Sequence, residues 1–279
     1  MTEQTRRSIS PGMEEILRDP IKVLGKGFIR VVDYMGNDSA ICQSARVSYG
    51  KGTKTVNEDR GLIRYLMSHW HSTPFEMCEI KLHVKLPVFV ARQWIRHRTA
   101  NVNEYSARYS ILDREFYFPN PEDLGVQSTS NKQGREGPLS ETQQILGILE
   151  NSANEAYDDY EKMLEMGLSR ELARMNLPTN IYTQWYWKVD LHNLFHFLRL
   201  RADSHAQFEI REYADAICKI VEQWVPHAYE AFEDYRLNAS QFSVHEMDML
   251  KNMTNTDNTP KHPDSISARE WEEFLAKIS

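Results

Sequence analysis

Hydrophobic and polar positions alternate most clearly along residues 79–86. Four aliphatic residues share one side of this segment, and charged residues with His83 share the other side. This pattern predicts a strand with one buried and one solvent-facing side. A shorter β-branched run, 29–34, ends at the turn signal Gly36-Asn37 and predicts a second strand. The aromatic segment 181–189 predicts a third.

Apolar residues with helical spacing predict most of the remaining elements. The predicted helices are one after Asp38, then 57–70, 88–98, 140–166, a short one before Pro178, 190–201, 204–224 and a last one introduced by the capping box Ser267-x-x-Glu270. Pro, Gly, Ser and Asn are frequent in residues 119–138, which predicts a long loop.

Composition narrows the class of protein. The 279 residues include 33 Lys and Arg against 40 Asp and Glu, which gives a net charge of −7. This charge, without a basic block, argues against a general nucleic-acid binder. Three scattered cysteines without a Cys-x-x-Cys pair indicate a reducing cytoplasm. We expect no membrane span, because no apolar run approaches the ~18 residues that one needs.

Side chains suited to binding an anion concentrate in residues 93–109. On the predicted helix, Gln93, Arg96 and His97 share one face. A guanidinium fork matches phosphate or carboxylate in a bidentate way, so this face is a candidate oxyanion site. The alternative is that Arg96 and Arg98 lie on a solvated face and pair with nearby acids.

The residues after this helix could add a second polar side to the same site. In an extended chain, Glu104, Ser106 and Arg108 fall together on one side because side chains alternate with period two. The hydroxyl of Ser106 and nearby backbone N–H groups could complete an oxyanion pocket.

A polar stripe on the predicted helix 190–201 is the other candidate region. His192, His196 and Arg199 follow one another at i, i+4 and i+7, opposite an apolar face. The stripe either faces solvent or lines a site. The histidine spacing also fits zinc ligands, but Asn193 stands where a metalloprotease has Glu, so a zinc hydrolase is only a third hypothesis.

Together these residues resemble the flavin-dependent thymidylate synthase family. The family signature is Arg-His-Arg, seven residues and then Ser, and Arg96-His97-Arg98 with Ser106 matches it. Three flanking segments also match in the family's order, and they are 71–76, 103–109 and 201–207. The resemblance covers about residues 23 to 236.

This resemblance implies the fold, the assembly and the reaction. The fold would be α+β, a single family-specific domain with a central antiparallel sheet flanked by helices, assembled as a homotetramer whose active sites are shared between subunits. The domain would span residues 23–238, between a polar N-terminal extension, 1–22, and a C-terminal extension, 239–279, that ends in a helix. The enzyme would be a methyltransferase of nucleotide biosynthesis that converts dUMP to dTMP. FAD would be the cofactor, with NADPH and 5,10-methylenetetrahydrofolate as co-substrates and no metal.

The resemblance also implies residue roles by position. The residues that would contact FAD are Thr73, Arg96, His97, Arg98, Glu104, Asp190, Leu191, His192 and His196. The residues that would hold dUMP are Gln93, Arg96, Glu104, Tyr105, Ser106, Ala107, Arg108, Arg174 and Arg201. Arg201 would lie at the uracil ring as the catalytic residue, and His71 would lie near the flavin and the folate.

The absence of a Pro-Cys pair fits this reading, because the classical thymidylate synthase adds such a cysteine to the pyrimidine. A fixed cation such as Arg201 could instead stabilise negative charge on the ring. Ser106 would then bind dUMP without attacking it. The leading alternative from another class is a nucleotide-binding regulatory protein that keeps the pocket but catalyses no turnover.

Overall fold

The computed structural model describes residues 7–47, 56–129, 134–254, 262–263 and 266–278. The predicted terminal extensions and the predicted loop 119–138 lie partly outside these residues. The chain forms two compact units, one ending at Leu237 and the other beginning at Asn238. Among the described helices, none combines the length and the apolar character that crossing a membrane requires.

A five-stranded antiparallel sheet forms the centre of the first unit, with the order β1-β2-β3-β7-β4. Its strands are β1 (Ile21–Val23), β2 (Gly27–Met35), β3 (Glu79–Pro87), β7 (Tyr182–Asp190) and β4 (Asn101–Glu104). The short edge strand β4 pairs with β7, so that Glu104 lies opposite Trp185. The mixed fold with a central antiparallel sheet flanked by helices, which the family resemblance implies, is confirmed.

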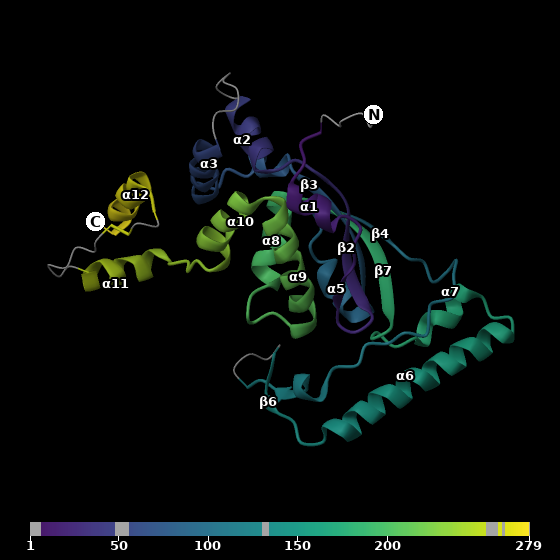
Figure 1. The fold of residues 1–279 in the computed structure, drawn as a ribbon. Helices are drawn as coiled ribbons and strands as arrows, with labels where there is room; N and C mark the ends of the chain where they lie inside the picture. Colours follow the sequence, from purple (N-terminus) through teal and green to yellow (C-terminus); the bar gives the residue numbers. More distant parts are fainter. Residues whose placement is uncertain (1–6, 48–55, 130–133, 255–261, 264–265, 279) are drawn as a thin grey trace. The chain divides into compact units, whose positions relative to one another are not determined.

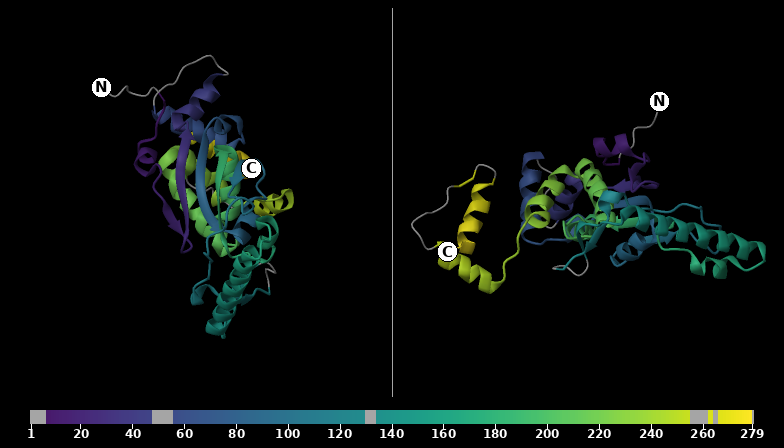
Figure 2. Two further views of the ribbon diagram at one scale, coloured as in Figure 1. Left: turned by 90° about the vertical axis from the view of Figure 1, so that its right-hand side faces the viewer. Right: turned by 90° about the horizontal axis from the view of Figure 1, so that it is seen from below.

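Three helices cover one face of the sheet: α5 (Val88–Trp94), α8 (Leu191–Arg201) and α9 (Phe208–Trp224). Figure 1 shows α8 and α9 side by side, and the left view of Figure 2 shows them behind the strands. Trp94 on α5 packs edge-on against Trp185 and Trp187 of β7 and stacks on Phe197 of α8. These rings are almost fully buried and fix α5 and α8 on the sheet.

The remaining elements surround this centre or follow it. The helices are α1 (Pro11–Ile16), α2 (Asp38–Val47), α3 (Val56–Ser68), α4 (Thr73–Glu76), α6 (Thr142–Glu165), α7 (Arg170–Ala173), α10 (Pro226–Phe232), α11 (Val244–Thr254) and α12 (Ala268–Ile278). Short 3₁₀ turns cover Pro121–Asp123 and Arg174–Asn176, and a π-helical turn covers Glu233–Leu237. The strands β5 (Gly125–Gln127) and β6 (Arg135–Pro138) pair antiparallel as a small second sheet.

Several predicted elements differ from the observed ones. The helix predicted over 88–98 ends at Trp94, and the one predicted from Ser204 begins at Phe208. The segment 119–138 is not a plain loop, because it contains the paired strands β5 and β6. Helix α11 was not predicted, although its Ser243 and Glu246 form the same reciprocal capping box as Ser267 and Glu270.

The polar side of β3 also departs from the prediction at His83. Its side chain is buried, because Phe28 and Tyr186 pack against the ring. Arg30 donates to its Nδ1 at 3.0 Å, and its Nε2 lies 2.9 Å from the carboxamide oxygen of Gln184. The alternating pattern of β3 placed His83 on the polar side of the strand. It could not show that the neighbouring strands β2 and β7 supply hydrogen-bond partners that allow the ring to be buried.

Candidate functional site

Arg96, His97 and Arg98 lie in the connection between α5 and β4, not on a helical face as predicted. Helix α5 ends at Trp94, and the N–H of the next residue, Ile95, donates to the Ala91 carbonyl of the last turn. The chain then turns again through a bond from the His97 N–H to the Trp94 carbonyl, 3.0 Å, and runs out to the edge of β7. Arg96 and Arg98 are exposed and form no ion pair among the described residues, whereas His97 is half-buried.

The extended chain predicted to place Glu104, Ser106 and Arg108 on one side continues only as far as Glu104. The Tyr105 N–H donates to the Gln184 carbonyl at 2.8 Å, which ends the pairing with β7. The carbonyl of Ser106 then accepts from the N–H groups of Tyr109 and Ser110, both at 3.1 Å. This tight turn, which an extended-chain pattern cannot predict, sets the directions of Ser106 and Arg108.

A cavity of about 530 Å³ opens beside this turn, and we call it the β4 cavity. Its lining includes five residues predicted to hold dUMP, which are Glu104, Tyr105, Ser106, Ala107 and Arg174. The Thr183 hydroxyl donates to Glu104 at 2.8 Å and orients that carboxylate. Arg174 is exposed, and no ion pair with a described residue holds it.

Gln93, Arg96 and Arg108, the three other dUMP candidates from this region, do not line the β4 cavity. The carboxamide oxygen of Gln93 is buried and has no hydrogen-bond partner in the described part of the chain. A buried acceptor without a partner is costly, so this atom is suited to a ligand. The Arg108 guanidinium is exposed and lies over the Tyr109 ring at 5.5 Å.

Arg201, at the end of α8, reaches the Arg-His-Arg segment. Its Nε donates to His97 Nε2 at 3.0 Å. Burial, followed by the charge of Arg201 and by His196, lowers the pKa of His97 to about 4. The ring is therefore neutral near pH 7, and because Nε2 accepts, its proton lies on Nδ1. Burial also lowers the pKa of Arg201, which still remains a cation.

A second cavity, of about 230 Å³, lies against α8, and we call it the α8 cavity. His192, His196 and Arg199 all line it, so the polar stripe of α8 borders a cavity. His71 and Ser72 line the same cavity just before α4. Thr73, the first residue of α4, is exposed and does not line it.

The start of α8 carries the remaining predicted FAD residues. Asp190 caps the helix, because its side chain accepts from the Asn193 N–H at 2.9 Å, as the sequence predicted. Leu191 is fully buried in the core. Only the backbone of Leu191 is therefore available to a ligand.

Trp70 and Arg236 also line the α8 cavity, and no sequence motif identified them. Trp70 lies in the turn after α3 and has a positive φ of 61°, and Arg236 comes from the π-helical turn after α10. The Arg236 guanidinium lies 3.4 Å from the centre of the Trp70 ring. A positive backbone φ and a distant tertiary contact leave no periodic signal in the sequence.

No group of three or more His, Cys, Asp or Glu side chains suited to holding a metal ion occurs within the described ranges. All three cysteines are free and buried. Burial raises the pKa of Cys42 and Cys78 to about 12 and that of Cys218 to about 11. The three thiols are therefore protonated at neutral pH and poor nucleophiles.

Comparison with known proteins links this geometry to one family. The model of the family described as "Thymidylate synthase complementing protein" matches residues 30–227. The chain is 64% identical to a flavin-dependent thymidylate synthase from Ruegeria pomeroyi, over 98% of this chain and 92% of that protein. It is 55% identical to the enzyme of the same name from Rickettsia conorii, over 99% of each protein.

A solved structure shows the same fold. The crystal structure of the UMP/dUMP methylase PolB from Streptomyces cacaoi, bound with 5-Br dUMP, aligns with a TM-score of 0.72 and 30% identity. The alignment covers 78% of this chain and 99% of that one.

Proposed function

The chain belongs to the flavin-dependent thymidylate synthase family, and from this membership we propose how its own residues divide the work of the reaction. As a member it is a methyltransferase that converts dUMP to dTMP with the help of a flavin. We propose FAD as this flavin and NADPH and 5,10-methylenetetrahydrofolate as the co-substrates. Bound FAD, once reduced by NADPH, supplies the hydride that completes the methyl group.

The α8 cavity fits a flavin. Its inner wall is apolar, with Phe75, Phe195 and Phe232, which suits a flat ring system. The imidazoles of His71, His192 and His196 stand around this wall and suit the carbonyl oxygens of the ring. We assign His192 and His196 to FAD on this basis.

The other FAD contacts in the proposal come from outside this cavity. They are Thr73, Arg96, His97, Arg98, Glu104 and the backbone of Asp190 and Leu191. Exposed Arg96 and Arg98 provide the cations for its diphosphate, and His71 would lie between the flavin and the folate.

The β4 cavity would hold dUMP. A nucleotide monophosphate needs cations for its phosphate and polar groups for its base, and Arg174, Ser106 and the Tyr105–Ala107 backbone meet at this cavity. Gln93 offers a buried acceptor without a protein partner. Arg96 and Arg108 would complete the phosphate site.

Arg201 would activate the pyrimidine. Carbon 5 of uracil becomes nucleophilic when negative charge on the ring is stabilised, and a half-buried guanidinium provides this without titrating near pH 7. The hydrogen bond to His97 fixes the direction of the guanidinium. The observation that carries this mechanism is that all three thiols are buried and protonated, so this chain offers no thiolate for addition to the ring.

We also propose a homotetramer with shared active sites. One chain presents the dUMP candidates and the flavin candidates at two separate cavities, and it leaves Arg96, Arg98 and Arg108 exposed. A neighbouring subunit would bring these groups together. The free cysteines favour the cytoplasm as the location.

Tritium release from [5-³H]dUMP tests the proposed reaction. Purified protein should release tritium and form dTMP when FAD, NADPH and the folate are all present, and dTMP should not form when either co-substrate is omitted. A protein that binds dUMP and FAD without turnover would instead be the regulatory alternative. A covalent adduct between a cysteine and the nucleotide would contradict the proposed role of Arg201.

A further inference from the structure

Arg199 and Arg236 face the α8 cavity without any carboxylate to balance them. The residues that line this cavity include neither Asp nor Glu. Within the described part of the chain, neither arginine forms an ion pair. Two acids that precede Arg236 in the sequence, Glu230 and Asp234, bind Arg60 and Arg64.

Arg236 is held rigidly in this unbalanced position. Its guanidinium lies over the Trp70 ring at 3.4 Å, an arrangement that attracts a cation. Its Nη1 donates to the Tyr235 carbonyl at 3.1 Å, and its Nη2 donates to the Met67 carbonyl. The remaining N–H groups of the fork stay available to a ligand.

The two arginines also repel each other. Burial, followed by the charge of Arg199, lowers the pKa of Arg236 to about 10. Holding two like charges at one cavity in a half-buried setting is unfavourable unless an anion lies between them. An oxyanion with several oxygens would relieve this repulsion and fill both guanidinium forks.

We propose that Arg199 and Arg236 form an anion subsite at the α8 cavity that binds the charged end of a co-substrate. The proposal rests on the function proposed above and adds two residues to it. The shared chemistry is a polyvalent oxyanion, and two sources fit: the glutamyl carboxylates of the folate and the phosphates of NADPH. The flavin diphosphate is not counted as a source, because the proposed function assigns it to Arg96 and Arg98.

Pairs of ligands that differ in the charged end distinguish these sources. Folic acid is compared with pteroic acid, which lacks the glutamyl group. NADPH is compared with reduced nicotinamide riboside, which lacks the phosphates and the adenosine, and reduced nicotinamide mononucleotide, which keeps one phosphate without the adenosine, separates these two losses. Dissociation constants are measured by calorimetry on the FAD-loaded enzyme, for the wild type and for Arg199→Gln, Arg199→Lys, Arg236→Gln and Arg236→Lys. Arg211→Gln is the matched control, because Arg211 is a half-buried arginine at another cavity that donates to the Ser204 carbonyl.

For one of the two pairs, we expect each Gln variant to reduce the preference for the charged ligand by about 10-fold or more, since charge-assisted hydrogen bonds are lost. The Lys variants keep the charge without the fork, so they should lose less. Arg211→Gln should leave both preferences unchanged. The pair that responds identifies the source of the anion.

Unchanged preferences in Arg199→Gln and in Arg236→Lys would overturn the subsite, even if Arg236→Gln fails to fold. Loss of bound flavin from Arg199→Gln with both preferences unchanged would overturn it as well. These results differ from a failure of the proposed function. In that case the wild-type enzyme would not form dTMP from dUMP with every co-substrate present.

Discussion

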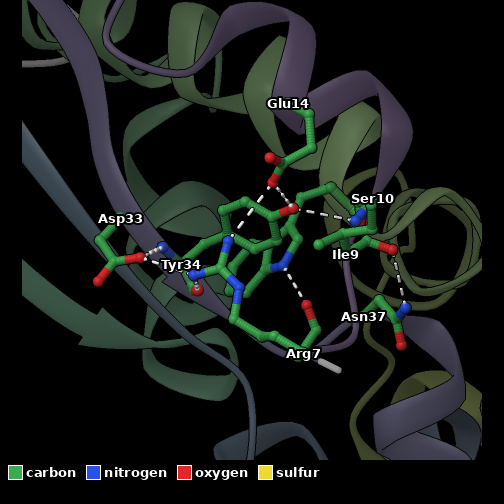
Figure 3. Close-up of polar contacts among 9 residues, drawn as sticks. Arg7, Ile9, Ser10, Glu14, Asp33, Tyr34 and Asn37 are labelled. Atoms are coloured by element: carbon green, nitrogen blue, oxygen red, sulfur yellow. Dashed lines mark hydrogen bonds and ion pairs between the residues drawn. The ribbon is translucent and has the colours of Figure 1, made fainter. Parts of the chain in front are cut away.

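Near the N-terminus, Arg7 donates to Asp33 at 3.0 Å, to the Tyr34 carbonyl at 3.3 Å and to Glu14 at 3.4 Å (Figure 3). At the α8 cavity, no Asp or Glu occurs among the described lining residues to balance Arg199 and Arg236. We call the N-terminal group of Arg7, Ser10, Glu14, Asp33 and Tyr34 the latch. Within it, the Tyr34 hydroxyl accepts from the Ser10 N–H at 3.0 Å and donates to Glu14.

The difference between these regions lies in where the partners of each charge come from. In the latch, acids and carbonyls of the same chain satisfy the arginine, so the interaction is complete when the chain folds. The Ser10 hydroxyl extends it by donating to the Trp224 carbonyl at 2.6 Å, which ties the N-terminal segment to the end of α9. At the two cavities, Arg174, Arg199 and Arg236 form no ion pair with a described residue, and in our proposal ligands supply their partners. Changes in the latch should therefore alter stability, and changes at the cavities should alter binding and turnover.

The largest expected effect is the loss of turnover in Arg201→Ala. Without a cation at the pyrimidine, kcat should fall about 10²- to 10³-fold, the typical result of removing a group that stabilises developing charge. FAD content should stay near that of the wild type, as measured by the flavin absorbance of the purified protein. Full turnover in this variant would remove Arg201 from the mechanism.

Tyr34→Phe should lower stability and leave turnover unchanged, the opposite of Arg201→Ala. The Ser10 N–H is buried and would lose its acceptor, which should reduce the free energy of unfolding by about 1–3 kcal/mol with kcat unchanged. Urea unfolding and steady-state kinetics on the same preparation measure both. Arg7→Gln is the control, since its exposed ion pairs should contribute less than about 1 kcal/mol. A fall in kcat without a fall in stability would contradict the division between the regions.

Ser106→Ala should have a smaller effect, confined to dUMP binding. Within the described structure, the Ser106 hydroxyl accepts from the Arg108 N–H at a long distance of 3.4 Å. Loss of one neutral hydrogen bond to dUMP should raise KM by up to about 10-fold, with kcat still measurable. An inactive variant that binds dUMP normally would mean that Ser106 participates in the chemistry.

The sequence predicted three strands of the sheet, β2, β3 and β7, and its covering helices because these elements depend on local periodicity, whereas the short strands β1 and β4 were not predicted. Residues 79–86 alternate, and the polar stripe on α8 lies opposite buried Leu194 and Leu198 as its spacing indicates. The candidate FAD and dUMP residues could be named from the sequence because the spacing between Arg96-His97-Arg98 and Ser106 is a family motif. Their roles stay predictions.

What could not be predicted depends on contacts between distant segments. Ser106 lies in a tight turn whose direction is set by the end of the β4–β7 pairing, not by alternation. Arg236 meets Trp70 through tertiary packing between the end of α3 and the π-helical turn. Helix α11 is different, because its Ser243–Glu246 capping box is a local signal that the sequence itself carries.

The smallest effect should appear in the dependence of stability on pH. The pKa of His97 is lowered from an ordinary value of 6.5 to about 4, so the folded protein favours the neutral ring. Its contribution is fully present above about pH 6.5 and is lost as the pH falls toward 4, because the unfolded chain takes up the proton first. The urea midpoint of the wild type should therefore fall more steeply over this window than that of His97→Gln. Tyr34→Phe should keep the wild-type slope, since the latch does not contain His97, and equal slopes in the wild type and His97→Gln would mean that burial beside Arg201 does not hold this ring neutral.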